Sequence, residues 1–200
     1  MNKQLLVDVR TFDVSREKID ESIKENNGRL VVKGVLQRAE SKNQNGRVYP
    51  REVLLREVEK YSGTNVKERR ALGELDHPES SVVNLNNASH NILEMHWDGD
   101  DLLGTVEVLS TPAGNILKEL FRSGIKLGIS SRGLGSVEPV NEGDGEDGTV
   151  EVQDDFELIA FDFVSNPSTH GAFMRPVNES VQHNNPETNI AKIVNDIMRG

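Results

Sequence analysis

The amino-acid sequence predicts an α+β protein that is mainly β. Along its 200 residues, segments in which apolar and polar residues alternate outnumber segments with helical spacing. These strand-like segments do not alternate regularly with helical ones, as they would in a doubly wound α/β fold. The length suits one domain with a tail, and 35% hydrophobic residues with only 4% aromatics indicate an aliphatic core.

The first part of the chain contains two predicted strands and two charged segments. Residues 5–12 and 30–36 are rich in Leu and Val and are expected to be strands. Residues 15–28 are highly charged and predict either a short surface helix or a loop. Residues 50–63 predict a helix with Pro50 at its first position, and its apolar face consists of Val53, Leu54, Val58 and Tyr61.

A β-hairpin is predicted near the middle of the chain. Residues 92–97 and 101–109 both have strand character, and Asp98-Gly99-Asp100 between them is a turn signal. The short apolar segment 71–75 precedes this hairpin and ends at Asp76-His77-Pro78.

The second part of the chain begins with another predicted helix. It starts at Thr111-Pro112, stops at Gly124, and is expected to turn four apolar residues inward: Ile116, Leu117, Leu120 and Phe121. Residues 126–130 predict a short strand, and residues 150–164 predict one or two strands. From about residue 177 the chain is polar and is expected to be disordered, apart from a small helix at 188–198.

Composition excludes several classes of function. With no cysteine, the chain has no disulfide scaffold, thiolate metal site or cysteine nucleophile. A net charge of -10 argues against non-specific nucleic-acid binding. No apolar run is long enough to span a membrane. The acidic stretches 98–101 and 142–147 lack the spacing of a calcium loop, so no metal site is expected.

Among the five histidines, His77 has the most distinctive context. It follows an apolar strand in the segment GELDHP, where a proline restricts the chain directly after it. Catalytic groups are often carried on loops that a rigid scaffold holds in place. His90 and His96 flank a hairpin strand and are expected at the surface, and His183 lies in the polar tail.

Two adjacent serines, Ser130 and Ser131, occur in the segment GISSRGLG. They follow a predicted strand and precede a glycine-rich turn, where glycine lets a backbone approach a substrate closely. A nucleophilic serine needs an exposed hydroxyl, a nearby base and N–H donors for the oxyanion. The segment fits a tight turn without chemistry equally well, and it does not match the GxSxG pattern.

Asp162 lies between two phenylalanines in an apolar strand. If its side chain points inward, the carboxylate requires a partner, and an imidazole N–H would supply one. If it points outward, the segment is an ordinary alternating strand. The sequence favours neither orientation.

Together these segments resemble the T4-type phage prohead core proteases, serine endopeptidases related in fold to herpesvirus assemblin. The resemblance runs from about residue 30 to residue 176. It includes KNQNGRVYP, GELDHP, the hairpin that contains Trp97, LSTPAGNILKEL, GISSRGLGS and FVSNPS, in this order. Several separated motifs in the right order make the match specific.

The resemblance implies an assemblin-like, closed or partly closed β-barrel with surrounding helices. It also implies that His77 is the general base and that Ser130 is the nucleophile, with Ser131 as the alternative. The third catalytic residue would be Asp162, with His170 as the alternative. Backbone N–H groups around Arg132 and Gly133 would bind the oxyanion, and no cofactor is implied.

Further expectations concern processing and substrates. Members of this family cut phage scaffold or core proteins and the major capsid protein, after a glutamate preceded two residues earlier by an aliphatic residue. Arg132 or Arg47 would bind that glutamate. The bond between Glu179 and Ser180 is a candidate for self-cleavage, so residues 1–176 would form the protease domain and 177–200 a removable tail. The resemblance places the protein inside the phage prohead in the host cytoplasm, and it leaves homo-oligomerisation open.

Two other functions compete with a protease. The chain could be a non-catalytic phage head structural or scaffold-associated protein on the same fold. It could also be a small binding domain of mainly β structure in which GISSRGLG is only a turn. The presence of His77, a serine pair and Asp162 argues for the enzyme.

Overall fold

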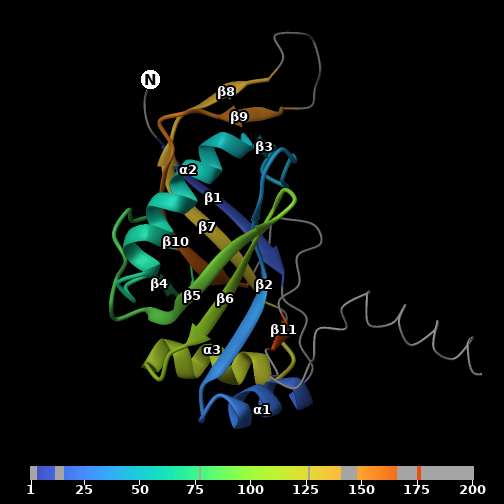
Figure 1. Cartoon of the computed structure of the whole chain (residues 1–200), viewed down its shortest axis with the longest axis vertical. Coiled ribbons are helices and arrows are strands. Elements are labelled where there is room, and N and C mark those ends of the chain that lie inside the picture. The colour runs from blue at the N-terminus through green and yellow to red at the C-terminus, as the bar shows by residue number, and fades with distance from the viewer. Residues whose placement is uncertain are drawn as a thin grey trace, which may run out of the picture.

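The computed structural model describes residues 4–11, 16–76, 78–125, 127–140, 148–165 and 175–176, with only the backbone described for 4–11 and 175–176. Its helical elements are α1 (Arg16–Glu25), α2 (Arg51–Tyr61), the π-helical turn η1 (Ser62–Val66) and α3 (Pro112–Arg122). Its strands are β1 (Gln4–Thr11), β2 (Leu30–Arg38), β3 (Arg47–Val48), β4 (Leu72–Glu74), β5 (Ala88–Asp98), β6 (Asp101–Val108), β7 (Gly128–Gly135), β8 (Val137–Pro139), β9 (Val150–Val152), β10 (Glu157–Val164) and β11 (Arg175–Pro176) (Figure 1).

Two larger sheets cross one another and enclose most of the core (Figure 1). One has the strand order β11-β2-β6-β5-β4 and the other has the order β1-β7-β10. Within both sheets, neighbouring strands are antiparallel. A parallel bridge between Leu75 and Phe163 joins the β4 end of the first sheet to the β10 edge of the second. A small third sheet, β3-β9-β8, lies beyond one end of α2.

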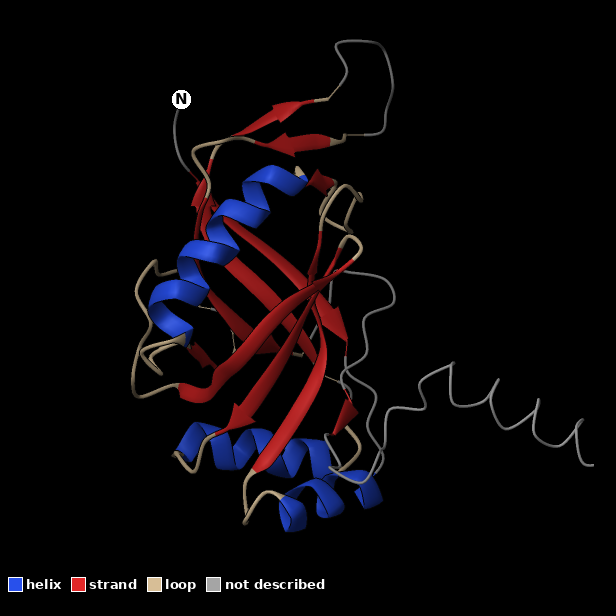
Figure 2. Ribbon diagram, viewed as in Figure 1, coloured by secondary structure: helices blue, strands red, loops and turns tan. Residues whose placement is uncertain are grey.

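The fold class is the predicted one, α+β and mainly β. The expected closed or partly closed barrel is not confirmed, because the described strands form three sheets of which none closes on itself. The helices do surround the sheets, with α1 and α3 at one end and α2 alongside the β1-β7-β10 sheet at the other (Figure 2).

The main core is aliphatic with a few phenylalanines, as the composition predicts. Its fully buried members come from both large sheets and from α1 and α3, and they include Ile19, Leu36, Val106, Leu117, Ile129 and Phe163. A second cluster forms where α2 meets the small sheet, around Tyr49 and Phe156, whose rings stack edge to face at 5.4 Å. Burial of these side chains is the principal stabilising contribution of the fold.

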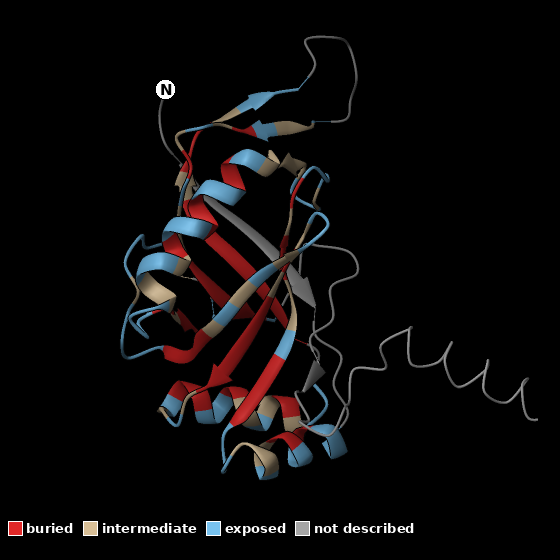
Figure 3. Ribbon diagram, viewed as in Figure 1, coloured by how far each residue is buried: buried red, intermediate tan, exposed pale blue. Residues whose placement is uncertain are grey.

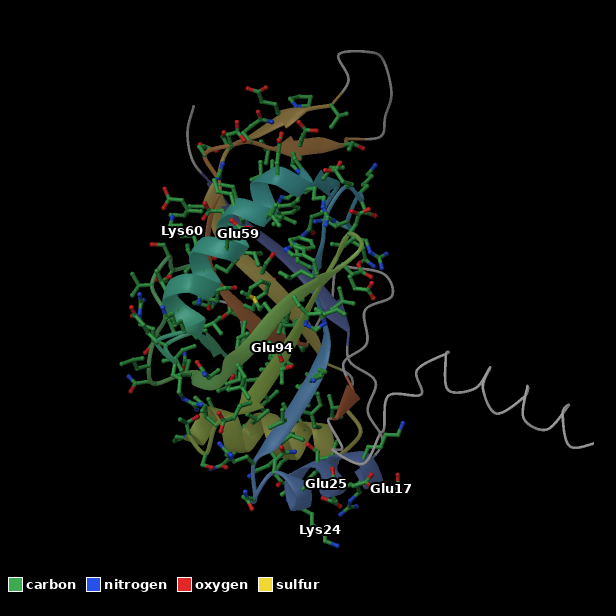
Figure 4. All side chains as sticks on the ribbon, in the orientation of Figure 1. Glu17, Lys24, Glu25, Glu59, Lys60 and Glu94 are labelled. Carbon is green, nitrogen blue, oxygen red and sulfur yellow. The ribbon has the colours of Figure 1, made fainter. Side chains whose placement is uncertain are left out.

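The helices follow their sequence signals with two exceptions. Residues 16–25 form helix α1, which decides between the two alternatives for that segment. Pro50 is the residue before α2 and not its first residue, although the four predicted apolar side chains are buried. On α3, Leu117 and Phe121 are buried, but Ile116 is 55% exposed, so its predicted inward position is wrong. The polar faces point outward, as Glu59 and Lys60 show on α2 (Figure 4).

The hairpin is confirmed as β5 and β6, and residues 150–164 form two strands, β9 and β10. The predicted short strand at 126–130 is confirmed from Gly128 on, but the glycine-rich turn expected after it is wrong. GISSRGLG is a continuous strand, β7, and a Cβ on Gly133 would lie 2.3 Å from the ring of Phe156. Glycine is therefore required here for close packing.

Several predicted segments lie outside the described residues, namely 142–147 and the tail 177–200 with its small helix. In the part of the chain that is described, no helix has both the length and the apolar character needed to cross a membrane.

Candidate active site

The site is built on β7, the central strand of the sheet β1-β7-β10. Seven of its eight residues are buried, so both of its faces are covered, and Figure 3 shows β7 and β10 as buried along most of their length. Successive side chains of a strand point to opposite faces. Ser130 and Arg132 therefore share one face of β7, and Ser131 lies on the other.

Ser130 and Asp162 are direct partners in the antiparallel pairing of β7 with β10. Opposite residues in such a pair project to the same face, so the hydroxyl and the carboxylate lie side by side. Both side chains are 0% exposed. The Oγ of Ser130 lies 3.4 Å from the carbonyl oxygen of Ser131, which is too long for a strong O–H···O bond.

Arg132 connects Asp162 to a second buried carboxylate, Glu74 of β4. Its Nη2 donates to Oδ1 of Asp162 at 3.2 Å and to Oε1 of Glu74 at 3.1 Å. Its Nε lies 2.8 Å from Oδ2 of Asp162, an ion-pair distance, although this N–H does not point at an acceptor. The three side chains are 0% exposed and form one buried ionic network. Asp162 thus points inward, and its described charge partner is a guanidinium.

The chain around position 77 is attached to this network on both sides. Before it, the backbone N–H of Glu74 donates to Oδ1 of Asp162 at 2.9 Å, and that of Asp76 donates to the carbonyl of Phe163 at 2.8 Å. After it, the carbonyl of Ser80 accepts from Nη1 of Arg132 at 2.7 Å. The backbone N–H of Asn84 donates to Oε1 of Glu74 at 2.9 Å. The described residues on both sides of position 77 are therefore bonded to Asp162, to Arg132 or to β10.

Ser131 has a different environment. It lies opposite Phe161, on the face that points into the main core. Its Oγ accepts a hydrogen bond of 2.9 Å from Nε2 of Gln37, a buried residue at an irregularity in β2. The hydroxyl of Ser131 is thus held between the two sheets.

The prediction that His90 lies at the surface is wrong. This residue is completely buried between β5 and β10. Its Nε2 lies 2.9 Å from the carbonyl of Phe161, and its Nδ1 lies 2.8 Å from Oγ of Ser89. Burial lowers the pKa of His90 to about 4, against weaker opposing effects of Asp162 and of the Phe161 carbonyl. It is neutral at pH 7 and ties β5 to β10. His96, as predicted, is exposed.

The structure brings Ser130, Asp162 and Arg132 together. Gly133 adjoins them in β7 and packs on Phe156. Arg132 is inside the protein and not on its surface, whereas Arg47 is half-buried on β3. Four predicted site residues lie outside the described part of the chain: His77, His170, Glu179 and Ser180.

Sequence reasoning missed Glu74 and Gln37. No local sequence pattern indicates either residue. Glu74 contacts Arg132 and Gln37 contacts Ser131, and both partners are at least 58 positions away in the sequence. Within the described residues, no group of three His, Asp or Glu side chains could hold a metal ion.

Comparison of this chain with known proteins identifies its family. Residues 10–182 match the family described as prohead core protein serine protease. The chain belongs to this family. The assignment agrees with the resemblance that the separated sequence motifs indicated.

A similar sequence and a similar solved structure agree with the assignment. The chain is 35% identical over 150 residues to the prohead core protein protease of Enterobacteria phage T4, which is 74% of this chain and 68% of the relative. It is also similar to the solved structure of the bacteriophage T4 capsid assembly protease, with a TM-score of 0.70 and 28% identity. That match covers 84% of this chain and all of the other.

Proposed function

We propose that this prohead protease is a serine endopeptidase in which Ser130 is the nucleophile, His77 the general base and Asp162 the residue that orients His77. The observation that carries the proposal is the register of β7 with β10, which sets Ser130 directly beside Asp162 on one buried face. A hydroxyl, a carboxylate and a neighbouring histidine segment are the components of a serine protease triad.

The mechanism follows from these roles. The Oγ of Ser130 attacks the carbonyl carbon of the scissile peptide, and its proton passes to His77. The tetrahedral intermediate collapses when the C–N bond breaks, and His77 returns the proton to the leaving amine. Water, activated by His77, then hydrolyses the acyl-enzyme. Asp162 holds the imidazole tautomer and stabilises the imidazolium.

The contacts of the two serines favour Ser130 over Ser131. Ser130 lies on the same face of β7 as Arg132, which is bonded to the Ser80 carbonyl soon after position 77, and the Ser130 hydroxyl has only a long contact within the described residues. Ser131 lies on the core face, and Gln37 holds its hydroxyl. A nucleophile must be able to transfer its proton to a base, which the surroundings of Ser131 do not provide.

The attachment of the chain on both sides of position 77 supports His77 as the base. Asp76 has a φ of 69°, a left-handed conformation that turns the chain sharply next to β10. Asp76 and Ser80 are both bonded to β10 or to the network. His170 stays the alternative to Asp162.

Oxyanion binding by the backbone of Arg132 and Gly133 stays a prediction. Both residues lie in a central strand that pairs with β1 on one side and β10 on the other. Since successive N–H groups of a central strand point to neighbours on opposite sides, binding by both groups requires β7 to part locally from β1 and from β10 during catalysis.

The substrates we propose are the scaffold or core proteins and the major capsid protein of a phage prohead, inside the host cytoplasm. Support comes from the relatives, whose names describe a prohead core protein protease and a capsid assembly protease. The preference for glutamate preceded two residues earlier by an aliphatic residue, with Arg47 or Arg132 binding it, is part of the same proposal. In this structure Arg132 is fully buried, so Arg47 is the more accessible of the two.

Covalent labelling with a fluorophosphonate tests the catalytic serine. We expect one adduct per chain at Ser130, its loss in Ser130→Ala and His77→Ala, and its retention in Ser131→Ala. Because Ser130 is 0% exposed, labelling should be slow until local opening exposes it. No adduct in either the intact or the processed chain would favour a non-catalytic head protein. An adduct at Ser131 would reverse the assignment of the two serines.

Intact mass spectrometry tests self-cleavage between Glu179 and Ser180. Purified protein should yield with time a species that ends at Glu179, and Ser130→Ala should remain at full length. Glu179→Gln is the matched variant, because it keeps the shape of the side chain but removes the charge. If active protein never yields this species, or if Ser130→Ala yields it equally, self-cleavage at this bond is wrong.

A further inference from the structure

The buried network contains one positive and two negative side chains. Arg132 faces Asp162 and Glu74, and no part of the three side chains reaches solvent. Isolated charges are expensive to bury unless they are paired. One guanidinium fully compensates only one carboxylate, so the network has a net charge of about one negative unit when all three groups are ionised.

The contacts of Arg132 fix the orientation of the Asp162 carboxylate. Nη2 and Nε approach its two different oxygens, at 3.2 and 2.8 Å. The backbone N–H of Glu74 adds a third contact, to Oδ1 at 2.9 Å. These contacts come from two different elements, β7 and β4, and hold the carboxylate in one orientation.

The positive charge of Arg132 also acts against the proposed role of Asp162. A guanidinium beside Asp162 opposes the stabilisation that this carboxylate gives to an imidazolium. Glu74 offsets the positive charge from the other side of the guanidinium, and its Oε2 is buried with no hydrogen-bond partner in the described part of the chain. An oxygen without a donor keeps its full negative potential in a medium of low dielectric constant.

We propose that Arg132 and Glu74 are positioning residues for the proteolysis proposed above: Arg132 orients the carboxylate of Asp162, and Glu74 keeps the network negative so that Asp162 can stabilise a positively charged base. The inference rests on the proposed function. It gives Arg132 a role inside the protein that differs from substrate binding. It also explains why the strand that contains the proposed nucleophile contains a completely buried arginine.

Other groups near the network must be considered in any test that varies pH. Among the described residues, the titratable groups that interact with Asp162 or Arg132 include Glu74 on β4, His90 on β5 and Tyr61 on α2, and Arg70 after η1 interacts in turn with Tyr61. His90 is neutral above about pH 4, and burial raises the pKa of Tyr61 far above neutrality. Neither changes charge between pH 5 and 9, the range of the experiment.

The experiment is the rate of fluorophosphonate labelling at Ser130 between pH 5 and 9, corrected for the folded fraction from near-ultraviolet circular dichroism. In a serine hydrolase, the acid limb of this profile reports protonation of the general base. Three variants separate charge from geometry. Arg132→Lys keeps the charge, Arg132→Gln removes a positive charge, and Glu74→Gln removes a negative charge but keeps the oxygen that accepts from Arg132.

The three variants have different expected signatures. Arg132→Lys should lower the plateau rate by about tenfold or more, with the acid limb in place, because one ammonium cannot replace the planar contacts of a guanidinium. Arg132→Gln should move the limb to higher pH by about half a unit or more, because the network becomes more negative. Glu74→Gln should move it to lower pH by a similar amount. A purely structural role would lower the melting temperature and leave the limb of the folded protein unmoved.

Each possible outcome decides for or against the proposal. Shifts of opposite sign for Arg132→Gln and Glu74→Gln support it. Unchanged profiles in both variants would refute the inference and leave the proposed function intact. If Arg132→Gln does not fold, Arg132→Lys and Glu74→Gln still give independent results, and a wild-type plateau rate in Arg132→Lys together with an unmoved acid limb in Glu74→Gln would refute the inference. Absence of labelling in the wild-type protein would remove the proposed function and the inference together.

Discussion

A single buried imidazole couples the stability of this protein to pH. The pKa of His90 is lowered from 6.5 to about 4 by burial, so the folded state resists a proton that the unfolded chain accepts. The stabilising effect is fully present above pH 6.5 and is lost as the pH falls toward 4. By linkage, this one group should make the protein about 2 kcal/mol less stable at pH 5 than at pH 7.

Urea unfolding of the wild-type protein and His90→Gln at both pH values measures this effect. Glutamine can donate to the Phe161 carbonyl but does not titrate, so the loss of stability on acidification should be smaller in the variant by about 2 kcal/mol. Since the carboxylates contribute equally to both proteins, the difference isolates the histidine. An identical pH dependence in the two proteins would contradict the buried neutral state of His90.

Substitution of each of the two adjacent serines should show which one stabilises the fold. In Ser131→Ala, Nε2 of Gln37 loses its buried acceptor, which should cost about 1–3 kcal/mol of unfolding free energy. In Ser130→Ala, the one contact removed within the described residues is 3.4 Å long, so stability should change by less than about 0.5 kcal/mol. Thermal or urea unfolding of the two variants provides the comparison. A larger loss in Ser130→Ala would mean that Ser130, and not Ser131, has the structural role.

At the scale of elements, β7 depends on glycine for close packing. A Cβ at position 133 would lie 2.3 Å from the Phe156 ring and 2.7 Å from the backbone oxygen of Glu157. Backbone cannot move aside easily, so Gly133→Ala should destabilise the protein by about 1–3 kcal/mol. Gly63→Ala is the control, because no atom lies within 4 Å of its added Cβ. Equal unfolding free energies for the two variants would show that the tight contact is not a constraint.

Elements with local signals were predictable from the sequence, and long-range relations were not. Thr111 before Pro112 indicated the start of α3, where the threonine side chain does accept from the N–H of Gly114. The glycines of GISSRGLG were misinterpreted, because glycine marks both tight turns and close packing, and only the position of Phe156 decides between them. In the same way, a sequence does not reveal that Arg132 contacts Asp162 and Glu74, or that the ring of His90 contacts the carbonyl of Phe161.

At the scale of the whole molecule, protection against exchange with solvent should be uneven. Strand β7 is covered on both faces and paired on both edges, so its amides should exchange only through extensive unfolding. The strands of the small sheet are two or three residues long and largely exposed or half-buried, and they should exchange by local opening. Hydrogen exchange with mass spectrometry should find the slowest peptides in 128–135. Fast exchange there at neutral pH would contradict the central position of β7.

Strand β7 acquires its two neighbours from opposite ends of the chain. Its partner β1 is formed by residues 4–11 and its partner β10 by residues 157–164. During synthesis on a ribosome, Ser130 can therefore meet Asp162 only after nearly the whole domain has been made. A growing chain that has not reached residue 162 lacks the carboxylate beside the proposed nucleophile, and we expect it to be inactive.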